Sequence, residues 1–138
     1  MPRFVLLHHE CPTGDPRPTH YDLMLEADGA LRTWTIVELP CSWDATAGLS
    51  SSVGENIVAE QLPDHRLAYL DFEGPVSGGR GNVSPIDAGT LTTVSESADR
   101  WVVALIGQRI RGQLELSRLT ANGPRWQLTF QPEVRQKD

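Results

Sequence analysis

Short apolar runs with a two-residue period dominate the chain, and none of its windows shows the 3.6-residue period of a long helix. The segment HYDLMLE (residues 20–26) shows the alternation clearly, because its side chains would point in turn to opposite faces of a strand. Further strands are predicted at residues 3–7, 31–39, 56–62, 67–72, 90–95, 101–106, 113–119 and 125–130. Short strands at such regular spacing are typical of an antiparallel sandwich or barrel.

Turn and loop signals separate these runs. Asp28-Gly29 predicts a hairpin turn, and Asn122-Gly123 joins the last two strands. The sequence CPTGDPRP (residues 11–18) predicts a loop, and residues 73–89, rich in Gly, Pro and Ser, predict a long loop with at most one short strand. We expect one domain over residues 1–138, with a flexible polar tail at residues 131–138.

Composition narrows the class of protein. The first apolar run covers only Phe4–Leu7, too short for a signal peptide or a membrane span, and Cys11 and Cys41 have no CxxC spacing. We therefore expect a cytoplasmic protein without a membrane partner or a disulfide. The net charge of −6 excludes a strongly basic DNA-coating protein. Seven of the twelve basic residues follow residue 99, so a local basic face or a scatter of solvated arginines is expected there.

A candidate metal site begins with the pair His20 and Asp22. At spacing two on a strand, both side chains lie on one face, and an imidazole nitrogen with a carboxylate oxygen suits Zn²⁺ or Mn²⁺. This spacing also occurs by chance, and a third ligand would have to come from His8 or His9, at the end of the first strand. Cys11 could join the site and favour Zn²⁺, although a free cysteine in a loop is the simpler interpretation.

Four segments together resemble one known family. They are FVLLHHE, THYDLMLEADGALRTW, DHRLAYLDFEGPVSGG and GQRIRGQLELSRLTANGPRWQL, and they extend over residues 3–130. They resemble the 3′-phosphoesterase domain of bacterial end-joining DNA ligases (the ligase D type), which also occurs as a stand-alone protein. The resemblance implies an all-β protein, mainly an antiparallel β-barrel with short flanking helices and long loops. It also implies a Mn²⁺-dependent enzyme that removes a ribonucleoside or a phosphate from 3′ ends of DNA or RNA.

The resemblance assigns roles to individual residues. The metal ligands that it implies are His9, His20 and Asp22, with Mn²⁺ as the expected ion and Zn²⁺ as the alternative. It implies that His65 binds or protonates the phosphate and that Tyr69 hydrogen-bonds it. The polar row of residues 20–26 would then line the inside of the barrel, where Glu26 would support the site. A separate DNA ligase or polymerase would be the expected partner for a stand-alone enzyme.

Three departures from the family pattern affect the phosphate. The family has an arginine where this chain has Met24, a lysine where it has Glu38, and an arginine where it has Ile57. Charge-assisted hydrogen bonds of this kind contribute about 1.5–3 kcal/mol each. Arg17, in the loop of residues 11–18, and Arg80, in the glycine-rich loop, are the candidate replacements.

The departures leave three functions open. The first is a metal-dependent phosphoesterase acting on nucleic-acid 3′ ends. The second is a catalytically impaired, metal-containing binding module of the same fold. The third is a phosphodiesterase for a small substrate, because a site with fewer cationic contacts would suit a less charged ester.

Overall fold

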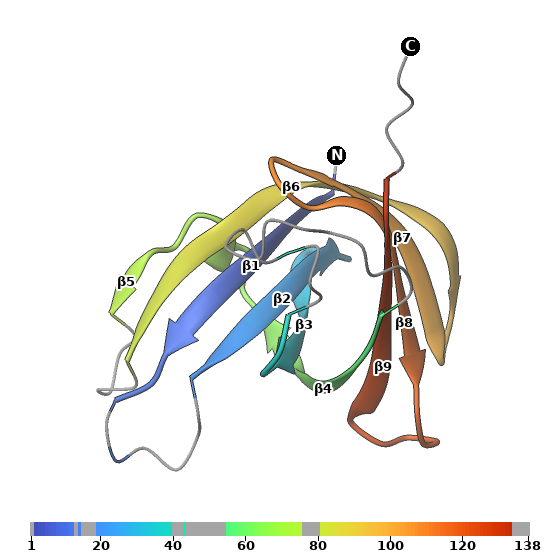
Figure 1. Ribbon diagram of the computed structural model, residues 1–138, viewed down its shortest axis with the longest axis horizontal. Helices are drawn as coiled ribbons and strands as arrows, with labels where there is room; N and C mark the ends of the chain where they lie inside the picture. Colours follow the sequence, from blue (N-terminus) through green and yellow to red (C-terminus); the bar gives the residue numbers. More distant parts are fainter. Residues whose placement is uncertain are drawn as a thin grey trace.

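The computed structural model describes residues 2–12, 14, 19–39, 43, 55–75 and 81–133. Within these residues, nine strands form one antiparallel sheet (Figure 1). Their bounds are β1 (Arg3–Glu10), β2 (His20–Ala27), β3 (Ala30–Ile36), β4 (Glu55–His65), β5 (Gly74–Pro75), β6 (Asn82–Ser97), β7 (Arg100–Gly107), β8 (Arg111–Arg118) and β9 (Arg125–Pro132). A short 3-10 helix, η2 (Leu67–Leu70), follows β4.

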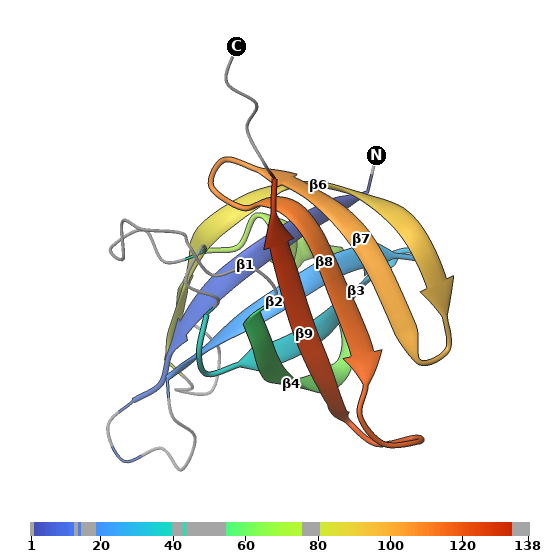
Figure 2. The same cartoon turned by 45° about the vertical axis from the view of Figure 1, so that its right-hand side comes forward.

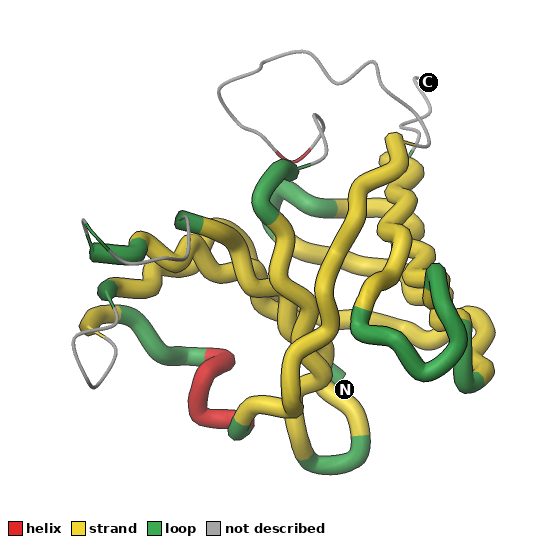
Figure 3. The backbone as a smooth tube through the Cα atoms, turned by 90° about the horizontal axis from the view of Figure 1, so that it is seen from below, coloured by secondary structure: helices red, strands yellow, loops and turns green. Residues whose placement is uncertain are grey.

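The sheet closes on itself into a ring of hydrogen-bonded strands. The order runs from β1 through β2, β3, β4, β9, β8 and β7 to β6, and β6 pairs back with β1. Figures 1 and 2 show the resulting twisted, barrel-like sheet, and Figure 3 shows η2 beside it. The expected all-β, mainly antiparallel class is therefore confirmed. No helix among the described residues is long and apolar enough to cross a membrane.

Local turn chemistry determines the hairpin that carries the candidate site. Asp28 and Gly29 join β2 to β3 with φ values of 54° and 80°. Both values lie in the left-handed region that a two-residue hairpin of type I′ requires, and Asp and Gly tolerate it better than most residues. This turn was predicted from the sequence, and it fixes the register in which Asp22 pairs with Thr35.

Two predictions in residues 67–89 are wrong. Residues 67–70 form η2 instead of a strand, because the apolar side chains of this segment pack onto the outer face of the sheet. The predicted long loop contains the start of β6 at Asn82. Pro85 lies opposite Leu7, where the strand register shifts. Proline is tolerated there because no backbone N–H donor is needed at such an irregularity.

Two apolar clusters lie on opposite faces of the sheet, because side chains alternate along each strand. Leu23 and Leu25 belong to the cluster inside the ring, whereas Met24 between them belongs to the other. The interior core comprises Phe4, Leu6, Leu23, Leu25, Trp34, Ile36, Trp43, Ala59, Leu91, Trp101, Val103, Leu105, Ile110, Leu114, Leu116, Trp126, Leu128 and Phe130. The outer cluster comprises Val5, Leu7, Met24, Leu31 and Val83.

The tryptophans are part of the interior core. Trp34 lies between Trp101 and Trp126, with ring centroids 6.1 Å and 5.6 Å away. Trp43 is 1% exposed and packs edge-on against Phe130, so its aromatic surface is used for packing.

An ion pair on β7 and β8 gives a prediction about pH. Arg100 donates two hydrogen bonds to Glu115, at 3.0 Å and 3.2 Å, and this bonding lowers the pKa of Glu115 below its ordinary value. Because the pKa of Glu115 is lower in the folded state, its ionised carboxylate stabilises the folded protein at pH values above the unfolded-state pKa. This stabilisation is lost as the pH falls through the folded-state pKa. Glu115→Gln is therefore expected to lower the free energy of unfolding slightly at pH 7 and to leave it unchanged at pH 2, measured by urea titration at both pH values.

Candidate metal centre

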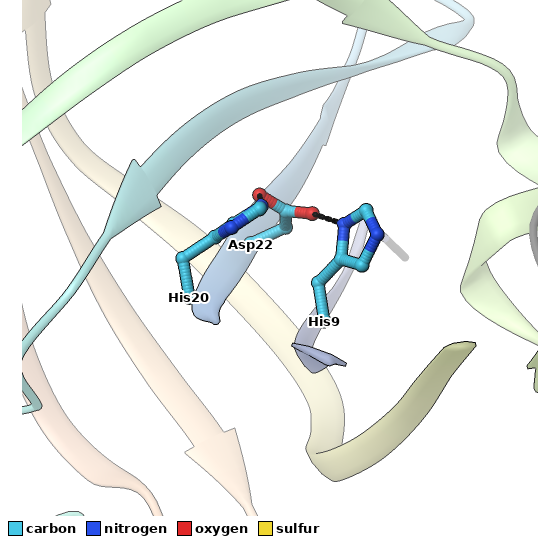
Figure 4. Close-up of side chains that lie close together, drawn as sticks. All are labelled: His9, His20 and Asp22. Carbon is cyan, nitrogen blue, oxygen red and sulfur yellow. Dashed lines mark ion pairs between the residues drawn. The ribbon is translucent and has the colours of Figure 1, made fainter. Parts of the chain in front are cut away.

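The end of β1 and the start of β2 bring three side chains together. His9 pairs directly with His20 across the two strands, and Leu7 pairs with Asp22. The three polar side chains lie on the same face as Leu7 and Met24, which belong to the outer cluster. Figure 4 shows them pointing toward one another. The expectation that this row lines the inside of the barrel is therefore wrong, since the interior core occupies that face.

The cluster is buried and closely spaced. His9, His20 and Asp22 are 8%, 6% and 5% exposed, and their potential ligand atoms all lie within 4.8 Å of one another. Nδ1 of His9 is 3.6 Å from Oδ2 of Asp22, and Nε2 of His20 is 3.4 Å from Oδ1. The second contact is close enough for an ion pair but lacks hydrogen-bond geometry, so Oδ1 is buried without a hydrogen-bond partner among the described residues.

This arrangement fits a divalent metal ion. Two imidazoles and one carboxylate form a three-ligand set that leaves further coordination positions for water or substrate. Such N and O donors suit Zn²⁺ and Mn²⁺. The buried oxygen of Asp22 without a hydrogen bond is the atom that a bound cation would satisfy.

The neighbouring candidates lie beside this set. Sγ of Cys11 is 3.9 Å from Nδ1 of His20, the ring nitrogen that does not face Asp22. The thiol of Cys11 therefore approaches the side of the His20 ring that faces away from Asp22. It is not one of the potential ligand atoms that lie close together in the cluster. His8 packs against Tyr21, with ring centroids 5.2 Å apart, on the opposite face of β1 from His9.

His65 and Tyr69 form a second pair, with ring centroids 5.4 Å apart. Nδ1 of His65 is 2.9 Å from the carbonyl oxygen of Pro63, which can only accept, so Nδ1 carries a proton and donates it. Tyr69 packs against the outer cluster. His65 pairs with Leu31, and Leu31 pairs with Glu26. In this register His65 lies two strands away from β2, opposite a residue that follows Asp22 by four positions.

The supporting residues have different positions. Glu26 lies at the far end of β2, where its carboxylate accepts a hydrogen bond of 2.9 Å from the backbone N–H of Arg3. The structure thus gives Glu26 a backbone partner at a distance from the cluster. Arg17 and Arg80, the candidate replacement cations, lie outside the described residues.

The three departures from the family pattern have distinct surroundings. Met24 is 2% exposed and fills the outer cluster, two residues after Asp22 and on the same face of β2. Glu38 is exposed, and Ile57 packs partly against the interior core. Of the arginines in the predicted basic face, Arg100 pairs with Glu115 and Arg118 with Asp99.

Comparison with known proteins identifies the family of the chain. Residues 8–118 match the family described as the DNA ligase D 3′-phosphoesterase domain. The chain is 31% identical over 126 residues to the multifunctional non-homologous end joining protein LigD of Pseudomonas aeruginosa, covering 86% of this chain and 14% of that protein. It is 33% identical over 130 residues to the multifunctional non-homologous end joining DNA repair protein LigD of Mycobacterium tuberculosis, covering 89% and 15% respectively.

The chain thus spans only a small part of the length of these relatives, and the match covers most of the chain. The matched residues include all three members of the buried cluster, His9, His20 and Asp22. The chain belongs to the DNA ligase D 3′-phosphoesterase domain family.

Proposed function

We propose that the protein is a divalent-metal-dependent phosphoesterase that removes a 3′-phosphate or a 3′-ribonucleoside from nucleic-acid ends during DNA end repair. The observation that carries this proposal is the buried cluster of His9, His20 and Asp22, in a chain of the 3′-phosphoesterase family. A buried carboxylate oxygen without a hydrogen bond is costly unless a cation or a proton satisfies it. The cluster is therefore better explained by ligand binding than by a contribution to stability.

In this proposal His9, His20 and Asp22 hold the metal, with Mn²⁺ as the expected ion and Zn²⁺ as the alternative. When bound, such an ion polarises a phosphoryl oxygen and makes water a better nucleophile. Burial of the three side chains orients their donor atoms and limits the access of bulk water.

His65 and Tyr69 would act on the substrate phosphate. Because Nδ1 of His65 donates to Pro63, Nε2 is the ring nitrogen that remains to take up or return a proton. The phenol of Tyr69 can donate a hydrogen bond to a phosphate oxygen. The edge-on contact between the two rings restricts both side chains.

A binding module without turnover is the second candidate. It is favoured by the surroundings of Met24 and Glu38, since one is buried in the outer cluster and the other presents a carboxylate where a phosphate would need a cation. Such a protein would bind the metal and a nucleic-acid end without hydrolysing it. If the protein is instead the phosphoesterase, a separate ligase or polymerase would act on the resulting 3′ end.

Hydrolysis of an oligonucleotide primer ending in a 3′-phosphate tests the proposal. Purified protein is incubated with Mn²⁺ or with a chelator, and conversion to a 3′-hydroxyl is followed by gel mobility. We expect conversion with Mn²⁺ and at least about a hundredfold less with chelator, as for an enzyme that depends on its ion. Absence of conversion by protein shown to contain Mn²⁺ would favour the binding module.

A further inference from the structure

An open groove of about 510 Å³ lies beside the end of β3, the start of β4 and the start of β9. The pairing of β3 with β4 ends at Thr35 and Glu60, and beyond this pair the end of β3 and the start of β4 face each other across the groove. Among the described residues, the groove is lined by Thr35, Val37, Glu38, Ile57, Val58, Glu60 and Arg125.

Strand register connects this groove to the metal centre. Asp22 pairs with Thr35, Thr35 with Glu60, and Glu60 with Arg125. Residues directly opposite in neighbouring strands point to the same face, so the four side chains form one row across the sheet. Neighbouring strands are about 4.8 Å apart, which places Glu60 about 10 Å from Asp22. A substrate held at the metal centre and extending along this row would lie over the groove.

The charges in the groove are unfavourable for a nucleic-acid strand. Glu38 and Glu60 are exposed carboxylates, and the guanidinium of Arg125 lies opposite Glu60 in the register. The three charges sum to −1. Surfaces that follow a phosphate backbone collect lysine and arginine instead. Val37 and Val58 are 61% and 60% exposed, so they offer apolar contact area beside the carboxylates.

We propose that this groove determines specificity, and that Glu38 and Glu60 weaken the binding of substrates that bring further phosphates over the groove. The groove then accepts the uncharged sugar or base of an ester with a single phosphate against the apolar surface of Val37 and Val58. This inference rests on the proposed phosphoesterase function and names the substrate class of the same site. A mononucleotide-like ester is favoured over a long strand.

The test compares two substrates with the same 3′ terminus: a nucleoside 3′-monophosphate and an oligonucleotide ending in that nucleotide with its 3′-phosphate. For each, kcat/KM is measured with Mn²⁺ for the wild type and for the double variant Glu38→Gln/Glu60→Gln. Removing an exposed like charge changes an interaction by about threefold, so the double variant should raise kcat/KM for the oligonucleotide about tenfold. The value for the mononucleotide should change less than about twofold, which also shows that the fold is intact.

Glu133→Gln is the matched control, because Glu133 is an exposed carboxylate just beyond the other end of β9 and does not line the groove. It should leave the ratio of the two kcat/KM values unchanged. An unchanged ratio in the double variant would overturn the proposed specificity role.

Calorimetric titration of the same two ligands separates this inference from the proposed function. The ligands are titrated into Mn²⁺-loaded wild type and double variant, and the ratio of the two Kd values should shift about tenfold, as for kcat/KM. If the wild type hydrolyses neither substrate but the Kd ratio shifts, the phosphoesterase proposal fails and the groove proposal stands. If hydrolysis occurs and neither ratio shifts, the groove proposal fails alone.

Discussion

Asp22→Asn is expected to weaken Mn²⁺ binding by at least about a hundredfold, since even residues that only support metal ligands contribute 10–100-fold. Asp22 supplies the carboxylate of the cluster, and its Oδ1 is buried without a hydrogen-bond partner among the described residues. Asparagine has nearly the same shape but lacks the negative charge. The substitution should therefore remove metal binding while the apolar packing around β2 is retained.

Thermal unfolding with and without Mn²⁺ measures this effect. At an ion concentration of about 100 times Kd, binding to the folded state adds about 2.7 kcal/mol to the free energy of unfolding and raises Tm by several degrees. The wild type should show this shift, and Asp22→Asn should lose it together with the hydrolysis of 3′-phosphate ends. Asp28→Asn is the control, because Asp28 is exposed in the β2–β3 turn, where asparagine is also tolerated. A full Mn²⁺ shift in Asp22→Asn would contradict the proposed site.

Part of this site could be predicted from the sequence. The two-residue spacing of His20 and Asp22 places them on one face of any strand, whatever the fold. Spacing alone could not decide whether His8 or His9 is the third ligand, because this depends on the register of β1 against β2 across the long connection between them. In the structure His9 pairs with His20, and His8 points to the other face.

The alternation of side chains along β2 could not predict which face of the sheet carries the cluster. Both rows of β2 contain apolar residues, since Leu23 and Leu25 alternate with Met24. Alternation shows that two faces differ but not which of them lies inside a closed ring. The outer cluster exists because η2 and the residues after it cover that face, and this packing brings together segments far apart in the sequence.

Long-range register also explains what the sequence did not indicate. Thr35 and Glu60 belong to ordinary strand patterns, and nothing in their local sequence connects them to Asp22. They become neighbours of the metal centre through the pairing of β2 with β3 and of β3 with β4. The start of β6 was missed for a related reason, because its pairing with β1 outweighs the preference of Gly, Pro and Ser for loops.

Asp87→Ala is expected to lower the free energy of unfolding by about 3–5 kcal/mol, because several backbone N–H donors would lose their acceptor and a buried unsatisfied donor costs about 1–3 kcal/mol. Asp87 is 6% exposed on β6. Its Oδ1 accepts hydrogen bonds from the N–H groups of Ala88 and Gln108, at 2.9 Å and 3.0 Å. Its Oδ2 accepts from the N–H groups of Arg109 and Ile110, at 3.0 Å and 2.7 Å. Alanine would leave these donors without their acceptor.

Urea unfolding of three variants measures this contribution. Asp87→Asn should cost less than Asp87→Ala but remain clearly destabilising, because its amide group would face two N–H donors in place of one carboxylate oxygen. Asp99→Ala is the matched control. Asp99 pairs with Arg118 at 3.1 Å but its side chain is 73% exposed, so its removal should cost less than about 1 kcal/mol. Equal losses for Asp87→Ala and Asp99→Ala would contradict the proposed role of Asp87.

The Asp87 variants also separate stability from metal binding. Asp87 connects the turn between β7 and β8 to β6, and β6 closes the ring by pairing with β1, which carries His9. None of its four hydrogen bonds involves a residue of the metal cluster. Folded Asp87→Ala at low temperature should therefore bind Mn²⁺ within about twofold of the wild type, because distant sites act independently. A lower free energy of unfolding with unchanged Mn²⁺ affinity would show that the ring closure stabilises the fold without changing the affinity of the cluster for the ion.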